Sequence, residues 1–216
     1  MGFTGIPDEA FLFYEGLEAD NSKTYFTRNK QLYENAVRAP MQALADELAE
    51  EFGEAKLFRP YRDVRYSRDK SPYKTHQGAF VSLAHGIGYY VEVNADGLFA
   101  AGGVYSTAPD QVARFRAAVD EDLTGKALED IVEALDAAGY ERAGERLKTR
   151  PRGIPEDHPR LDLLRHKSLY AGRRWEPEPW VHTAEVADRV RACWRDGAPL
   201  VGWLCDHVRG SELPRR

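Results

Sequence analysis

The chain has 216 residues, of which 43% are hydrophobic and 30% are charged, and its formal net charge is −5. This composition, with 4 Trp, 11 Tyr and 9 Phe, excludes a disordered chain and predicts one domain over residues 1–216. The negative balance disfavours general attraction to nucleic acid or to anionic membranes.

Three features bear on localisation. The N-terminal residues lack the basic and apolar stretches of a signal peptide. The longest uncharged run, Gln77 to Val91, is too short to cross a membrane. Cys193 and Cys205 have no partner motif, so we interpret them as buried thiols of a reducing compartment, with a disulfide between them as the alternative. The sequence therefore predicts a cytoplasmic protein without a membrane partner.

The first 53 residues predict helices. Asn21 or Ser22 is suited to cap the second helix, because a short polar side chain accepts hydrogen bonds from the first free amides. Pro40 predicts a break or kink. The third helix has the cleanest apolar period, over Met41–Phe52, and Gly53 ends it.

Strands follow in the middle of the chain. Residues 79–83, 89–93 and 98–101 are rich in β-forming side chains, and turn signals at 85–86 and 94–97 separate them. Connections this short join antiparallel neighbours, because parallel pairing needs a long crossover. The segment predicts an antiparallel β-meander.

The last hundred residues predict mainly helices. We expect helices over 109–122 and 127–138, a loop from Lys148 to Pro159, a short helix near 161–166, a strand over 168–175, and C-terminal helices over 184–208 interrupted at 197–199. N-terminal helices, a central antiparallel β-meander sheet and C-terminal helices together define an α+β fold.

A basic segment runs from Arg59 to Thr75. It holds six Lys or Arg and two Asp, and guanidinium and ammonium groups are the usual partners of phosphate and carboxylate. An extended start followed by a turn at 69–72 would bring its side chains together. The predicted ligand-binding residues are Arg62, Arg65, Lys70, Tyr73 and Lys74. The alternative is a network of Arg–Asp pairs through Asp63 and Asp69 that only organises the fold.

A second candidate is the pair Gly102 and Gly103, between a strand and a helix. Glycines allow close backbone approach, and the helix N-terminus that follows favours anions. The pair lacks the spacing of a phosphate-binding loop. The alternative is a bulged edge strand, followed by a helix that Ser106 or Thr107 caps.

A third candidate is the second basic region, which contributes Arg165 and Lys167 to the predicted ligand-binding set. His158 is a candidate acid/base group, because histidine titrates near neutral pH, or else a helix cap. Tyr73 is the other catalytic candidate. The six histidines show no metal-ligand spacing, so the sequence predicts no metal, and it predicts no cofactor.

These segments also carry a family resemblance. The chain resembles a large family of conserved hypothetical proteins of unknown function, found mainly in bacteria, with fungal members. The resemblance rests on Arg-Asp-x-Arg-x-Ser-x-Asp-Lys-x-Pro-Tyr-Lys-Thr at 62–75, Tyr89-Tyr90, Gly102-Gly103, Asp157-His158-Pro159 and Leu164-Arg165-x-Lys167-Ser168. It implies a single α+β domain and marks these motifs as family signatures, without implying an activity.

Three functions remain open from the sequence. The first is binding, with or without catalytic turnover, of a phosphorylated or carboxylated small molecule in an Arg/Lys-lined pocket. The second is a structural or protein-interaction module, although no protein partner is indicated. The third is nucleic-acid binding with Tyr61, Tyr66 and Tyr73 as stacking side chains, which the net charge disfavours. Whether the protein is an enzyme is left open.

Overall fold

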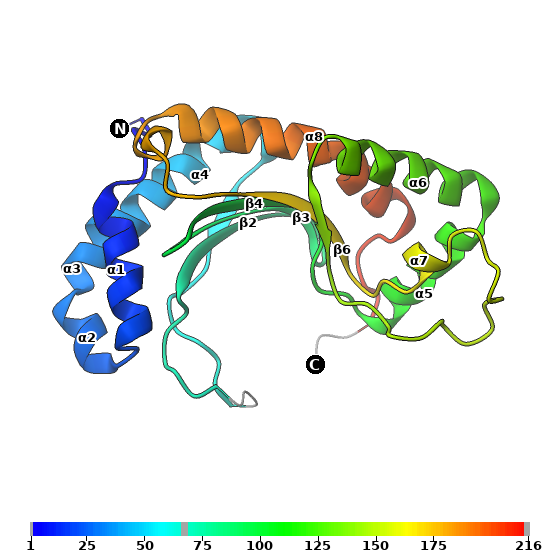
Figure 1. Ribbon diagram of the computed structural model, residues 1–216, viewed down its shortest axis with the longest axis horizontal. Helices are drawn as coiled ribbons and strands as arrows, with labels where there is room; N and C mark the ends of the chain where they lie inside the picture. Colours follow the sequence, from blue (N-terminus) through cyan, green and yellow to red (C-terminus); the bar gives the residue numbers. More distant parts are fainter. Residues whose placement is uncertain (1, 66–68, 214–216) are drawn as a thin grey trace. The chain divides into compact units, whose positions relative to one another are not determined.

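The computed structural model describes residues 2–65 and 69–213 (Figure 1). Helices come first, strands next and helices again, which confirms the predicted α+β class. In chain order the elements are α1 (Asp8–Ala19), α2 (Lys23–Arg28), α3 (Lys30–Leu32), the π-helix η1 (Tyr33–Arg38), α4 (Ala39–Phe52), β1 (Ala55–Leu57), β2 (His76–Ala84), β3 (Ile87–Asn94), β4 (Gly97–Val104), α5 (Pro109–Asp120), α6 (Asp122–Ala137), β5 (Glu141–Ala143), α7 (Leu161–Leu164), β6 (Leu169–Trp175), the 3-10 helix η2 (Pro179–His182) and α8 (Glu185–His207).

The strands of the described residues form one six-stranded antiparallel sheet in the order β1-β2-β3-β4-β6-β5. The predicted meander is its centre, β2-β3-β4. The turn between β3 and β4 is held as the sequence predicts, with the Asp96 amide donating to Asn94 Oδ1 at 2.9 Å. The two outer strands, β1 and β5, have three residues each and were not predicted.

Packing divides the chain into two compact units, each built from separate segments. Unit 1 comprises the described residues of Met1–Val81, Tyr90–Ala100 and Arg174–Ala192, and unit 2 those of Ser82–Tyr89, Ala101–Arg173 and Cys193–Arg216. The long strands contribute residues to both units. The assignment of one domain to residues 1–216 stays a prediction.

The helices of unit 1 begin and end largely as predicted. Ser22 caps α2 by accepting a hydrogen bond from the Tyr25 amide at 3.1 Å. The break predicted at Pro40 is absent, because the π-helical segment continues into α4 through Arg38 and Ala39, which are both helical, and Pro40 lies in the first turn of α4. A kink there stays a prediction. Gly53 ends α4 at a φ of 93°. Arg191, in the first part of α8, lies 3.6 Å from a carboxylate oxygen of Glu51, and this ion pair links that part of α8 to α4.

In unit 1, α4 and the first part of α8 lie along one side of the strands (Figure 1). On β2, Gln77, Ala79 and Val81 are buried, whereas His76 and Phe80 on the opposite face are half-buried. Successive side chains of a strand point to opposite faces, so the alternation shows which face packs on the core.

The same alternation continues on β3. Val91 and Val93 are buried, and Tyr90, Glu92 and Asn94 are half-buried. Unit 1 therefore presents a partly exposed sheet face with polar side chains on neighbouring strands.

In unit 2, α6 begins at Asp122 rather than near residue 127 as predicted. The Glu121 carboxylate accepts hydrogen bonds from the amides of Leu123 and Thr124, at 3.0 and 2.7 Å, and thereby caps the helix early. The predicted capping of α5 by Ser106 or Thr107 is wrong, because Ala108 is the capping residue and its amide donates to Gln111 Oε1 at 3.0 Å.

The interruption predicted at 197–199 is also absent, because α8 continues through Pro199. A proline inside a helix costs about 3 kcal/mol, through its missing N–H and the clash of its ring. Trp194, Leu200 and Leu204 are fully buried, and burying each of them contributes about 1.5–3 kcal/mol. Burial of the apolar face of α8 outweighs the local cost of the proline.

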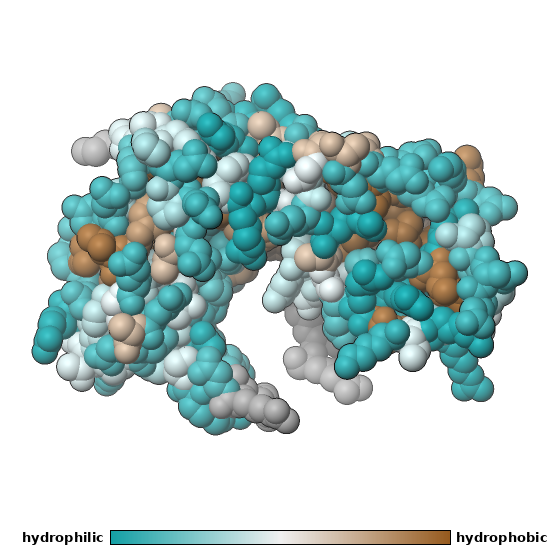
Figure 2. All heavy atoms as spheres, viewed as in Figure 1, coloured by the Kyte–Doolittle hydropathy of each residue, from teal (hydrophilic) through white to brown (hydrophobic). Residues whose placement is uncertain are grey.

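Hydrophilic residues dominate the surface in the view of Figure 2, and hydrophobic residues form small separate patches. Cys193 and Cys205 form no disulfide among the described residues, and Cys193 is buried as interpreted from the sequence, whereas Cys205 is only half-buried. No helix among the described residues is long and apolar enough to span a membrane. The large hydrophobic side chains exposed in the described residues are Leu12, Tyr61, Leu83, Tyr105, Leu123 and Leu213.

Candidate functional site

The described part of the basic segment folds back on itself within unit 1. Its two arms pair through an antiparallel bridge between Tyr61 and Tyr73. Asp69 shapes the turn between them by accepting the Ser71 amide at 2.9 Å, as the sequence predicts. Tyr66 and Ser67 lie outside the described residues.

Tyr73 anchors this hairpin to the N-terminal helices. Its ring is 4% exposed and stacks on Phe26, with ring centroids 4.1 Å apart and planes 4° from parallel. The Asn21 side chain bonds both the amide and the carbonyl of Tyr73, at 3.1 Å each. Burial, and then the neighbouring Tyr61, raise the pKa of Tyr73, so the phenol keeps its proton at neutral pH.

The acids of the segment neutralise two of its cations. Arg65 donates to both carboxylate oxygens of Asp63, at 3.0 and 2.7 Å, and this hydrogen bonding lowers the pKa of Asp63 to about 2. Arg62 forms an ion pair with Asp69. These are the Arg–Asp pairs that the structural alternative predicts. Lys70, the remaining described cation of the turn, donates to the Val64 carbonyl at 2.9 Å.

Lys74 and Arg59 differ from those two arginines, because neither forms an ion pair with a carboxylate of the described residues. The Lys74 ammonium lies 4.9 Å from the centre of the Phe58 ring. Burial first, and then the charges of Arg59 and Arg62, lower the pKa of Lys74. Burial and neighbouring positive charges both disfavour the charged form of a lysine.

His76 and Glu92 adjoin Lys74 on the half-buried sheet face. His76 follows Lys74 by two residues, and its Nε2 lies 3.9 Å from Glu92 Oε2. The same carboxylate accepts the Tyr90 hydroxyl at 2.5 Å. Burial lowers the pKa of His76, Glu92 opposes this shift, and Lys74 and Arg62 add to it.

We call Arg59, Arg62, Lys74 and His76, with Glu92 and Tyr90 beside them, the basic face. Three permanent positive charges stand there against the carboxylates of Asp69 and Glu92. The predicted ligand-binding residues include Arg62 and Lys74 of this face but not Arg59, His76, Glu92 and Tyr90. The one sequence feature that points to this pairing is Gly78, because a glycine inside a strand often marks the close approach of another group. In the structure that group is Tyr90, since a Cβ at position 78 would lie 2.4 Å from its hydroxyl.

The other predicted site residues lie in unit 2. His158 Nδ1 accepts a hydrogen bond from the Arg160 amide at 3.0 Å, so Nε2 carries the proton that faces Asp120 at 3.1 Å. The Arg160 guanidinium, 7% exposed, donates to the Val119 carbonyl at 2.7 Å and to Asp122 at 2.8 Å. His158 and Arg160 together hold the loop to the junction of α5 and α6.

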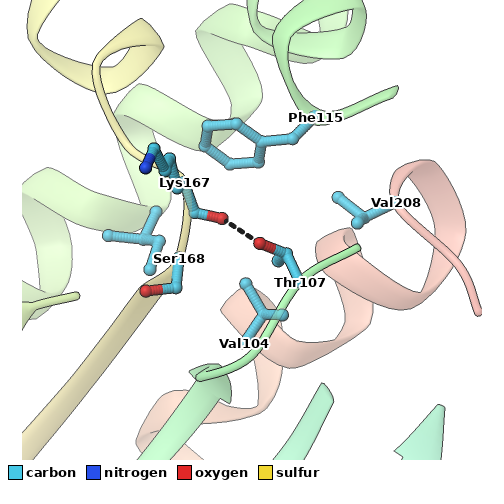
Figure 3. A pocket seen from close by; sticks show the side chains of 7 residues that line it. Val104, Thr107, Phe115, Lys167, Ser168 and Val208 are labelled. Carbon is cyan, nitrogen blue, oxygen red and sulfur yellow. Dashed lines mark hydrogen bonds between the residues drawn. The ribbon is translucent and has the colours of Figure 1, made fainter. Parts of the chain in front are cut away.

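Lys167 forms an ion pair with Glu145. The Lys167 backbone carbonyl accepts a hydrogen bond from the Thr107 hydroxyl at 2.8 Å. Figure 3 shows this hydrogen bond, with the side chains of Val104 and Phe115 on either side of it. Arg165 has its Nε buried without a hydrogen-bond partner among the described residues.

Gly102 and Gly103 lie where β4 packs tightly within unit 2. A Cβ at Gly103, whose φ is 147°, would lie 2.4 Å from the Leu169 carbonyl oxygen, and one at Gly102 would lie 3.1 Å from a Val201 methyl. β4 is an inner strand of the sheet, not the edge strand of the alternative. The ligand-binding role of the two glycines stays a prediction.

Unit 2 also contains a cavity of about 540 Å³. It lies between the residues that follow β4, those that follow β5, and the start of β6, and its lining includes Tyr105, Thr107, Glu145 and Ser168. No group of three or more His, Cys, Asp or Glu side chains in the described part of the chain is arranged to hold a metal.

Fold and sites together describe an α+β protein with an antiparallel sheet and a cationic sheet face. The model of the family described as Conserved hypothetical protein (DUF2461) matches residues 9–203, and the chain belongs to this family. No curated protein and no solved structure matches the chain.

Proposed function

We propose that the basic face of unit 1 binds a small molecule through a phosphate or carboxylate group. The observation that carries this proposal is the position of Lys74, which is half-buried and has no carboxylate partner among the described residues. Its pKa is lowered by burial first and then by the charges of Arg59 and Arg62. Holding like charges together costs free energy, and a bound anion relieves that cost.

Each cation has a distinct part in the proposal. Arg59 offers a planar guanidinium for two-point contact with the anion, and Lys74 adds a compact charge. Arg62 is paired with Asp69, so it attracts the anion through its positive charge at a distance rather than by direct hydrogen bonds. His76 becomes a further donor and a further positive charge when it is protonated.

The structural alternative accounts for part of the same segment. The stacking of Tyr73 on Phe26 and the Arg65–Asp63 pair organise the hairpin. They leave Arg59 and Lys74 without a carboxylate partner in the part of the chain that the structure describes, and a bound anion would supply one.

Nucleic-acid binding is less well supported. Tyr73, one of the three tyrosines expected to stack on bases, is 4% exposed and already covered by Phe26. Tyr61 is 52% exposed, and its ring lies beside those of Tyr73 and Phe26, with centroids 5.4 and 6.3 Å away. Base stacking along a strand needs successive accessible rings.

The proposal is tested by calorimetric titration with inorganic phosphate, pyrophosphate and citrate. We expect at least one of these anions to bind, and the variant Lys74→Gln to lose most of the affinity. Lys30→Gln is the matched control, because it removes the same charge from an exposed position on α3 of the same unit. Equal affinity in both variants, or binding of none of the anions by the wild type, would contradict the proposal.

A further inference from the structure

The cavity of unit 2 differs in chemistry from the basic face. Its volume of about 540 Å³ lies within the range of small-molecule sites, about 300–1,000 Å³. One wall depends on Gly144, whose φ of 131° and close approach to the Ser168 carbonyl exclude a side chain there. This glycine brings the segment after β5 against the start of β6.

The cavity has little net charge to offer a ligand. Glu145 is the one ionisable carboxylate or cation among its described lining residues, and it is paired with Lys167. The paired charges leave the lining without a net charge that would attract a charged ligand. The lining therefore favours a neutral, polar ligand.

Hydroxyl groups supply both donors and acceptors. The Ser168 hydroxyl accepts the Glu145 amide at 2.7 Å, so its own proton is left to donate. The Thr107 hydroxyl donates to the Lys167 carbonyl, so its lone pairs are left to accept. A ligand that carries several hydroxyls matches this mixture.

Two tyrosine rings supply an apolar surface beside these hydroxyls. Tyr105 is 75% exposed, and its ring centroid lies 6.0 Å from that of Tyr170, with the planes 44° apart. Aromatic faces carry partial negative charge and attract polarised C–H groups. The axial C–H groups of a sugar ring, beside its hydroxyls, have this chemistry.

We infer that this cavity binds a neutral saccharide, with the Tyr105 ring packing on the sugar and Ser168, Thr107 and Glu145 bonding its hydroxyls. The inference is independent of the proposed function, because it concerns another unit, other residues and a ligand without charge.

The test is a calorimetric titration of the full chain with glucose, galactose, N-acetylglucosamine, maltose and cellobiose. We expect at least one of them to bind with a dissociation constant below about 10 mM. Tyr105→Ala should weaken that binding about tenfold, the upper end for one aromatic contact. Leu123→Ala is the control, because Leu123 is a 79% exposed hydrophobic side chain of unit 2 outside the cavity.

Both variants should keep the wild-type melting temperature, since both side chains are exposed. Binding of none of the sugars would overturn the inference, and so would equal affinity in Tyr105→Ala and wild type. Phosphate binding that is lost in Lys74→Gln belongs to the basic face, so the two proposals fail separately.

Discussion

At the scale of single residues, the basic segment combines two roles that its sequence does not separate. Arg65 and Arg62 have acids to pair with, whereas Lys74 and Arg59 have none among the described residues. The difference arises from where the hairpin places each side chain relative to Asp63 and Asp69. A count of charges along the segment predicts a positive excess but not which cations carry it.

Tyr73 gives a prediction that distinguishes packing from chemistry. Tyr73→Ala should lower the free energy of unfolding by about 3–5 kcal/mol, the usual cost of removing a buried aromatic ring. Tyr73→Phe should be close to neutral, because the ring stacked on Phe26 is retained. Urea unfolding of both variants checks this. A Tyr73→Phe protein that keeps its stability but loses anion binding would instead show a chemical role for the hydroxyl.

Two histidines predict how stability depends on pH. Burial places the folded-state pKa values of His76 and His166 below the ordinary value of 6.5. As the pH falls through about 6.5, the unfolded chain takes up protons that the folded chain does not. The free energy of unfolding should therefore decrease below that pH and level off below the folded-state pKa values.

Urea unfolding at about pH 7.5 and about pH 5.5 measures this effect. The wild type should be less stable at the lower pH, and His76→Gln should show a smaller difference. Carboxylates such as Asp110, with a pKa lowered to about 2, lose their contribution at more acidic pH and so stay outside this window. Equal stability at both pH values would contradict the prediction.

At the scale of elements, local patterns predict those boundaries that local interactions determine. The apolar period of α4 and its Gly53 stop were readable, because both depend on neighbours in sequence. The early start of α6 was missed because glutamate is an uncommon cap. The interruption predicted at Pro199 was wrong because the burial of side chains along α8 outweighs the local cost of a proline inside a helix. The grouping of His76 with Glu92 depends on strand register, which the sequence alone leaves open.

The glycine pair of β4 gives a prediction at this scale. Gly103→Ala should destabilise by at least about 2 kcal/mol, since its φ of 147° disfavours a side chain and the added Cβ meets backbone of β6. Gly102→Ala should cost less, because the nearest atom belongs to a side chain that can shift, Val201. Urea unfolding compares the two variants, and an equal or reversed cost would contradict this account of the packing.

At the scale of the whole molecule, the two sites draw on different units and different forces. Phosphate binding at the basic face should weaken as sodium chloride is raised, because the site is open to solvent at the exposed Arg59 and salt screens the attraction between its cations and the anion. Saccharide binding in unit 2 should change little with salt. Calorimetry at low and high salt, on Lys74→Gln and Tyr105→Ala, should show each variant losing one ligand and keeping the other. Loss of both ligands in either variant would contradict the assignment of two separate sites.

The most direct test of the central claim is the pKa of Lys74, measured by NMR titration of its side chain with and without phosphate. The account predicts a pKa below the ordinary lysine value in the free protein, because of burial and the charges of Arg59 and Arg62. It also predicts that phosphate raises this pKa. An ordinary pKa that phosphate leaves unchanged would contradict anion binding at the basic face.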